Sequence, residues 1–209
     1  MTTPATESTP RRRRRSPESA EREILAAAES FLRERPFHEM TVDEVMARTT
    51  LSRPSFYVYF PDRNHLVIRL VDEVGAEVFA MAERWLKGSG DPRAEVRAAL
   101  EGVAGVWSEH GLLLGAMADA GKHDDDVDTA YRALLGRFID ATAEHIEDDI
   151  KAGLIEPLDP RETARALILM TERYLVATFG HDPVAPTETA VDTLWTLWVR
   201  ALYGSPTEA

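Results

Sequence analysis

Apolar residues recur at intervals of three and four along most of this chain, the spacing that places them on one face of an α-helix. Ile24, Ala28 and Phe31 are one example. No stretch of useful length alternates apolar and polar residues as a strand does, and we find no internal repeat. The pattern therefore predicts an all-α fold of nine helices, at about 17–35, 41–49, 52–60, 62–87, 91–110, 112–120, 127–152, 159–179 and 187–203.

Prolines and glycines mark several of the expected helix ends. Pro36 stops the first helix, because a proline ring clashes with the preceding turn. Gly111 is expected to interrupt the chain between the fifth and sixth helices. Gly153 is expected to cap the seventh in a left-handed conformation, with Leu154 as the hydrophobic contact that often follows such a cap.

The two short helices at 41–49 and 52–60 are separated by a tight break. Thr41 and Glu44 have the spacing of a capping box, in which each residue satisfies the amide of the other. Phe56 and Phe60 are four residues apart, so they share the core face of the second helix. Its opposite arc carries Arg53, Ser55, Tyr57, Val58 and Tyr59. This pair is typical of a helix-turn-helix, whose second helix enters the major groove of DNA.

The last two helices are apolar on more than one face. On 187–203, Leu194 and Trp198 belong to one stripe, whereas Leu197 adds apolar surface elsewhere. A helix with two apolar faces needs more than one partner. The pattern favours a homodimer in which 159–179 and 187–203 of two copies form a four-helix bundle. The alternative is that both are central core helices of a monomer.

Composition excludes several kinds of site. Apolar residues make up 44% of the 209, enough for a core, and there is no cysteine. Disulfides, thiolate metal sites and cysteine nucleophiles are therefore excluded. No apolar run approaches the roughly 18 residues of a membrane-spanning helix. The five arginines Arg11 to Arg15 precede no apolar segment, so they are not a signal peptide. We expect a cytoplasmic protein with no cofactor, no metal and no membrane contact.

The net charge of −12 is distributed unevenly. Residues 1–20 contain five arginines and two glutamates, and residues 21–70 contain seven arginines and eight acidic residues, so residues 71–209 carry a net charge of −14. Phosphate would repel so acidic a region. Any contact with nucleic acid must therefore come from the N-terminal third.

Residues 41–66 resemble the TetR family of bacterial repressors. The positions that match the family motif are Thr41, Val45, Leu51, Ser52, Ser55, Tyr57, Tyr59, Phe60, Arg63 and Leu66. Met46 and Arg63 replace a family alanine and lysine, and Thr50 replaces a family glycine. Thr50 is thus either left-handed, at a cost of about 1 kcal/mol or more, or part of an altered turn. Residues 51–61, 172–173 and 197–204 carry a closer resemblance to one repressor of the family.

This resemblance implies a DNA-reading surface on 52–60. Arg53 is the candidate for a bidentate contact to guanine, and Val58 for a contact to a thymine methyl. The other candidate DNA-binding residues, which would contact the phosphate backbone, are Thr41, Ser52, Ser55, Tyr57, Tyr59 and Arg63. Two alternatives stay open: Tyr57 and Tyr59 are ordinary packing residues, or Arg53 is a solvated surface charge.

The C-terminal helices place aromatic and polar residues on their inward faces. As a binding site, they would line an apolar pocket for a small effector, whereas the alternative is a filled core. The candidate ligand-binding residues are Trp107, Tyr131, Leu135, Phe138, Thr142, Thr171, Leu175 and Trp198. Thr142, Thr171 and Glu172 are polar positions on otherwise apolar faces. They would either orient a ligand or be partnered at a dimer interface.

The sequence thus predicts a disordered basic arm at 1–19, a helix-turn-helix domain at 20–66, and a ligand-binding and dimerisation domain at 67–209. The expected function is a regulator, most simply a repressor, that binds a palindromic operator as a dimer and is released by a small apolar effector. One alternative is a helical scaffold that does not read DNA. Another is a metal phosphohydrolase built on His110, His123 and Asp124.

Overall fold

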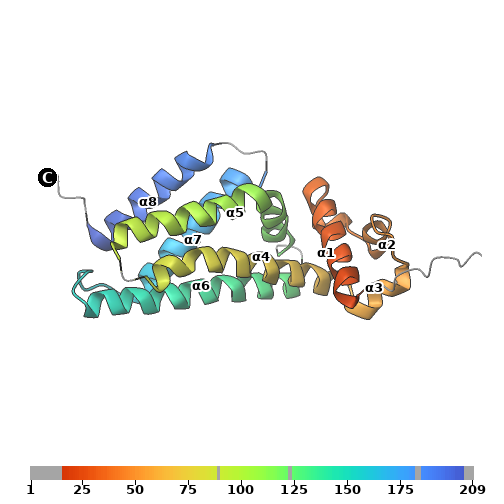
Figure 1. Cartoon of the computed structure of the whole chain (residues 1–209), viewed down its shortest axis with the longest axis horizontal. Coiled ribbons are helices and arrows are strands. Elements are labelled where there is room, and N and C mark those ends of the chain that lie inside the picture. The colour runs from red at the N-terminus through yellow and green to blue at the C-terminus, as the bar shows by residue number, and fades with distance from the viewer. Residues whose placement is uncertain (1–15, 89, 122–123, 182–184, 205–209) are drawn as a thin grey trace, which may run out of the picture.

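The computed structural model describes residues 16–88, 90–121, 124–181 and 185–204, and these ranges form eight α-helices and one 3₁₀ turn (Figure 1). In chain order the elements are α1 (Pro17–Glu34), η1 (Phe37–Glu39), α2 (Val42–Met46), α3 (Arg53–Tyr59), α4 (Arg63–Leu86), α5 (Pro92–Ala120), α6 (Asp125–Lys151), α7 (Pro160–Phe179) and α8 (Thr187–Tyr203). The fold is all-helical, as predicted. No helix within these ranges is long and apolar enough to cross a membrane.

The helices form two parts of the molecule. The head, defined here as α1, η1, α2 and α3, lies at one end. The body, defined as α4 to α8, makes up the rest, and α4 runs from the head along its length (Figure 1). The predicted arm at Arg11–Arg15 lies outside the described residues.

Buried aromatic and aliphatic residues of α1 and α3 form the core of the head. The Ser16 hydroxyl accepts from the Ser19 amide to begin α1, which buries Phe31 completely. Phe56 and Phe60 are 0% and 4% exposed, which confirms that they share the core face of α3. Their rings lie 5.6 Å apart, a spacing that contributes to packing beyond the buried area alone.

The predicted break at Gly111 is wrong, because α5 is a single helix of 29 residues. The glycine has another role at this position. A Cβ atom on Gly111 would lie 2.3 Å from the Phe179 carbonyl oxygen, and one on Gly115 would lie 2.4 Å from that of Gly180. The two glycines therefore let α5 approach the end of α7 at a distance that no other residue allows.

The C-terminal end of α6 partly follows the prediction. Gly153 has a φ of 75°, the left-handed cap that was expected. The hydrophobic contact, however, is not Leu154, which is 52% exposed. The next residue, Ile155, is 4% exposed and packs into the core instead.

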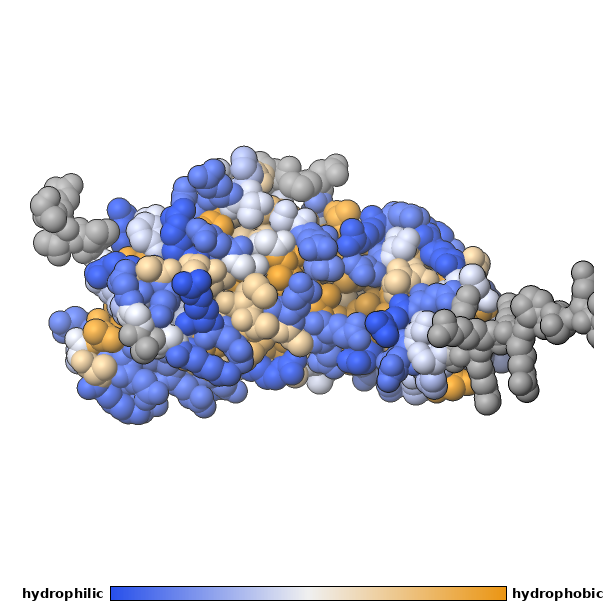
Figure 2. All heavy atoms as spheres, in the orientation of Figure 1, coloured by the Kyte–Doolittle hydropathy of each residue, from blue (hydrophilic) through white to orange (hydrophobic). Residues whose placement is uncertain are grey.

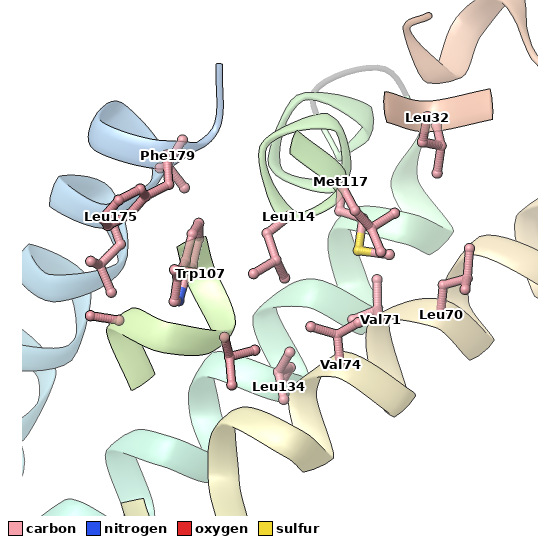
Figure 3. Close-up of a cluster of buried hydrophobic side chains, with 14 of the residues drawn as sticks. Leu32, Leu70, Val71, Val74, Trp107, Leu114, Met117, Leu134, Leu175 and Phe179 are labelled. Carbon is pink, nitrogen blue, oxygen red and sulfur yellow. The ribbon is translucent and has the colours of Figure 1, made fainter. Parts of the chain in front are cut away.

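One continuous core joins the body to the head (Figure 3). In the close-up, Trp107 of α5 and Leu175 of α7 lie at one side of this cluster. Met117 lies on the side towards the head, where Leu70 of α4 and Leu32 of α1 are also found. Since protein interiors are packed as densely as organic crystals, a displacement in one part of such a core is transmitted to its neighbours.

Candidate DNA interface and ligand cavity

The outer face of α3 exposes an aliphatic and an aromatic side chain, which are types that proteins usually bury. Val58 is 74% exposed and Tyr57 is 50% exposed, although α3 has only seven residues. Phe56 and Phe60 hold the opposite face of the segment in the head core. This short helix is thus anchored from behind and presents an aromatic and an aliphatic group to the outside.

Arg53 begins α3 and is also exposed. Its guanidinium pairs with the Asp43 carboxylate on α2, and it lies 5.6 Å from the centre of the Tyr57 ring. Exposed ion pairs contribute only about 0–1 kcal/mol, so Arg53 can exchange Asp43 for another anionic partner at small cost. The pair holds the arginine at the surface beside the other exposed groups of α3.

The hydroxyl groups at the starts of α2 and α3 each make a hydrogen bond within their own helix start. The Ser52 and Ser55 hydroxyl oxygens lie 3.0 Å apart, and Ser52, although at the N-cap position, accepts no backbone hydrogen bond through its side chain. The Thr41 hydroxyl accepts from the Glu44 amide at 3.2 Å, as predicted. In the other direction, hydrogen bonds from Arg35, from the Thr41 hydroxyl and from the Thr41 backbone lower the pKa of the Glu44 carboxyl.

Two predicted DNA contacts lie deeper in the structure. Tyr59 is half-buried against the head core. The Arg63 guanidinium donates to the Met40 carbonyl at 2.7 Å and lies 4.9 Å from the centre of the Phe37 ring. Arg63 therefore holds the 3₁₀ turn in place.

In the turn before α3, Thr50 takes the place of the family glycine, and its side chain makes a contact that a glycine could not make. No non-glycine residue of the described chain has a positive φ, so Thr50 adopts the altered turn and not the left-handed conformation. The Thr50 amide and hydroxyl both donate to the Glu23 carboxylate of α1, at 2.6 and 2.7 Å. The position of α3 is thus tied to α1 through one carboxylate.

The body contains a cavity of about 110 Å³. All eight predicted ligand residues, Trp107, Tyr131, Leu135, Phe138, Thr142, Thr171, Leu175 and Trp198, lie on its wall. Several further wall residues, among them Val78, Trp85 and Ile168, were not predicted from the sequence. Trp85 follows Val78 by seven residues on α4, so the helical period contained the information needed to find it.

Hydrogen-bonding groups occupy one region of this apolar wall. The Trp198 indole donates to the Thr171 hydroxyl at 2.8 Å, and the Tyr131 hydroxyl donates to the Glu172 carboxylate at 2.9 Å. Burial raises the pKa of Tyr131, and the nearby charge of Glu172 raises it further. Tyr131 therefore stays protonated and acts as a donor to Glu172.

Apolar side chains remain exposed on the helices predicted to form a dimer. Leu169 of α7 is 41% exposed and Leu197 of α8 is 45% exposed. Apolar side chains also gather in the middle of the face drawn in Figure 2, in the region of α4, α5 and α7, with polar groups around them. Since large exposed apolar patches mark interaction sites, these surfaces are candidates for contacts between molecules.

The residues of the phosphohydrolase alternative do not meet in the described part of the chain. His110 faces Glu29 and Glu77, at 3.0 and 3.7 Å, while Asp124 caps α6 and accepts from Asn64. His123 lies outside the described residues. Within the described ranges, no group of three or more acidic or histidine side chains is arranged to hold a metal ion.

Known protein families match both parts of the chain. Residues 24–70 match the bacterial regulatory proteins of the tetR family, and residues 96–204 match the C-terminal domain of the transcriptional regulator EthR. The HTH-type transcriptional regulator EthR of Mycobacterium tuberculosis H37Rv is 32% identical over 98% of this chain and 99% of its own. EthR of Mycolicibacterium smegmatis is 30% identical over 98% and 97%. These relatives confirm the closer resemblance, which is to the mycobacterial ethionamide-resistance repressor.

Solved structures show the same fold. A TetR-family regulator from Syntrophomonas wolfei superimposes with a TM-score of 0.77 at 13% identity, over 89% of this chain and 96% of its own. A TetR-like regulator from Rhodococcus sp. RHA1 has a TM-score of 0.69 at 25% identity, over 92% and 100%. The arrangement of head and body is therefore one that occurs in proteins of much lower sequence similarity.

Proposed function

Because the chain belongs to the TetR family, and is therefore a helix-turn-helix transcriptional regulator and not an enzyme, we propose that it represses transcription as a homodimer on a palindromic operator and is released by a small apolar effector. The observation that carries this proposal is the continuity between the cavity and the head. Cavity residues of α5, α6 and α7 belong to the same buried cluster as Leu32 of α1.

The DNA contact is assigned to the outer face of α3. Arg53, released from Asp43, reaches guanine, and Val58 contacts a thymine methyl. Tyr57, Ser52 and Ser55 contact phosphates next to them. Thr41, Tyr59 and Arg63 contact the backbone at the edges of this surface, and Arg63 has further N–H groups beside the one that donates to the Met40 carbonyl. The basic arm at Arg11–Arg15 adds attraction that does not depend on sequence.

The dimer is assigned to α7 and α8. A two-fold bundle of these helices buries Leu169 and Leu197 of both copies. It also places two α3 helices on one side of the assembly. A palindrome is read when the two helices lie about one duplex turn apart, roughly 34–36 Å. The acidic body then faces away from the phosphates.

We assign release from DNA to a shift in population between two forms of the dimer, which differ in the distance between their two heads. An effector that fits the cavity only in the form with the wrong spacing disfavours DNA by its difference in affinity for the two forms. The contacts of Trp107, Leu114 and Met117 on α5 carry the change towards Leu70 and Leu32 (Figure 3).

The test is selection of bound fragments from the host genome by the purified full chain, followed by gel shift and sedimentation. A repressor dimer retains a palindromic fragment, and the pair Arg53→Ala and Tyr57→Ala removes this binding without a change in melting temperature, because both side chains are exposed. Unchanged operator binding by the double variant overturns the assignment of α3.

The scaffold alternative predicts a different outcome of the same experiment. Its support is the acidic charge balance, together with the ion pairs that hold Arg35 and Arg48 of the head to Glu39, Glu44 and Glu34. If the chain dimerises but retains no genomic fragment, the protein is a helical scaffold that does not bind DNA. Sedimentation as a monomer overturns the assigned bundle.

A further inference from the structure

We propose that the cavity selects effectors that carry a protonated amine at the end of an apolar chain, and that Glu172 is the residue that binds the amine. This rests on the proposed effector site and names the chemical class of its ligand. Of the described residues that line the cavity, Glu172 alone is acidic. Its carboxylate is half-buried at a wall that is otherwise built of aliphatic and aromatic side chains.

The Glu172 carboxylate accepts fewer hydrogen bonds than its oxygens allow. A carboxylate accepts about four hydrogen bonds. In the described chain Glu172 accepts one, from the Tyr131 hydroxyl at 2.9 Å. A carboxylate removed from water is stabilised by a cation or by several donors, and here one neutral donor is present. The position therefore favours a ligand that brings both charge and N–H groups.

The arginines of the neighbouring helices do not supply the missing cation. On α6, Arg132 pairs with Asp128 and Arg137 with Asp72. On α7, Arg161 pairs with Asp140 and Arg165 with Glu162. Arg173 follows Glu172 directly and is exposed, on a different side of the helix.

The rest of the wall suits such a ligand. Trp107, Phe138 and Trp198 present aromatic rings to the cavity, and an ammonium group is attracted to the face of an aromatic ring. Aliphatic residues such as Leu100, Val103 and Leu135 then surround an apolar chain.

The charge of the body acts in the same direction. Residues 71–209 have a net charge of −14, which raises the local concentration of cations and lowers that of anions. An apolar carboxylic acid of the same length therefore meets repulsion both on approach and at Glu172. The expected order of affinity for matched molecules is amine, then alcohol, then acid.

The experiment compares three probes with one apolar chain: octylamine, octanol and octanoate at pH 7. Binding to the full chain is followed by the fluorescence of the tryptophans and by calorimetry. We expect octylamine to bind about tenfold or more tightly than octanol, as a charge-assisted hydrogen bond requires, and octanoate to bind most weakly. Equal affinities for amine and alcohol overturn the proposal.

Variants of the protein locate the effect at one residue. Glu172→Gln keeps the shape of the side chain, and is expected to lower the affinity for octylamine by about tenfold while leaving that for octanol within about twofold. Glu156→Gln, at an exposed loop position, removes the same charge away from the wall and is expected to change neither. An unchanged amine affinity in Glu172→Gln overturns the assignment of the amine site.

A second variant decides the matter if Glu172→Gln does not fold. Among the described residues, Tyr131 is the one that donates to Glu172, so Tyr131→Phe removes this donor. It is expected to increase the preference for amine over alcohol, whereas a decrease contradicts the proposal. Gel shift with an operator fragment in the same preparations separates this result from the proposed function. Octanol that binds and releases DNA as well as octylamine leaves the repressor function standing and overturns the amine site. If none of the probes binds, the amine site is overturned, and operator binding still judges the DNA-reading part separately.

Discussion

The head and the body use their side chains in opposite ways. In the head, the candidate functional groups Arg53, Tyr57 and Val58 are exposed and are held from behind by two buried phenylalanines. In the body, the candidate groups Trp107, Thr171 and Trp198 are buried and face a cavity. Changes in the head should therefore alter binding with little effect on stability, whereas changes in the body should alter both.

The largest expected effect is on packing in the body. Gly111→Ala places a methyl group 2.3 Å from the Phe179 carbonyl oxygen, and we expect it to lower the free energy of unfolding by about 1–3 kcal/mol. Gly105→Ala is the matched control on the same helix, because a Cβ there meets no atom within 4 Å. It should stabilise the protein by about 0.5–1 kcal/mol through helix propensity. Thermal unfolding followed by circular dichroism measures both, and equal melting temperatures would contradict the role given to Gly111.

The next effect concerns the head alone. Arg53→Lys keeps the positive charge but loses the planar fork that contacts guanine. We expect it to reduce discrimination between operator and altered sequence by about 1–3 kcal/mol, while binding to unrelated DNA and the melting temperature stay unchanged. Gel shifts with paired fragments that differ in one G·C pair measure this. A uniform loss on all fragments would show that Arg53 contacts phosphate only.

A smaller effect is expected at the turn that ties α3 to α1. The two Thr50 donors bond to the same Glu23 oxygen, so Glu23→Gln keeps an acceptor for both but removes the charge that strengthens both hydrogen bonds. The loss of charge assistance should lower the free energy of unfolding by about 1 kcal/mol. The double variant with Thr50→Gly removes one of these donors and allows the family turn, so the two substitutions should be less than additive. Strict additivity in a double-mutant cycle would mean that the contact does not stabilise the turn.

The smallest effect lies at the junction of the two parts, where Glu29 of α1 meets His110 of α5. Burial raises the pKa of Glu29, but hydrogen bonds from Arg33 and His110 outweigh it, so the net shift is below the ordinary 4.5. A depressed carboxyl pKa stabilises the folded state above pH 4.5, and this stabilisation is lost as the pH falls through the lowered value. Glu29→Gln should therefore unfold with a flatter pH dependence below about pH 5 than the parent chain. Parallel curves for the two proteins would contradict this.

How far each part is predictable follows from where its information lies in the chain. The head is encoded locally: Thr41 with Glu44, and Phe56 with Phe60, are close in sequence, so their spacing reveals the helices and their faces. In the body, the helical period places Trp107, Tyr131 and Trp198 on inward faces, and all three line the cavity. The role of Gly111 depends on Phe179, and that of Thr50 on Glu23, which are distant contacts that no local pattern contains.

The continuity of α5 has a mechanical consequence. The segment that carries Trp107 and the segment that carries Leu114 and Met117 point in different directions (Figures 1 and 3), yet they belong to one helix with no loop between them. A loop at Gly111 would absorb movement, whereas two segments joined by helical hydrogen bonds move together. A molecule that displaces Trp107 at the cavity wall therefore also displaces the segment of Met117 beside the head. In this way a cavity of about 110 Å³ acts on a surface at the opposite end of the protein.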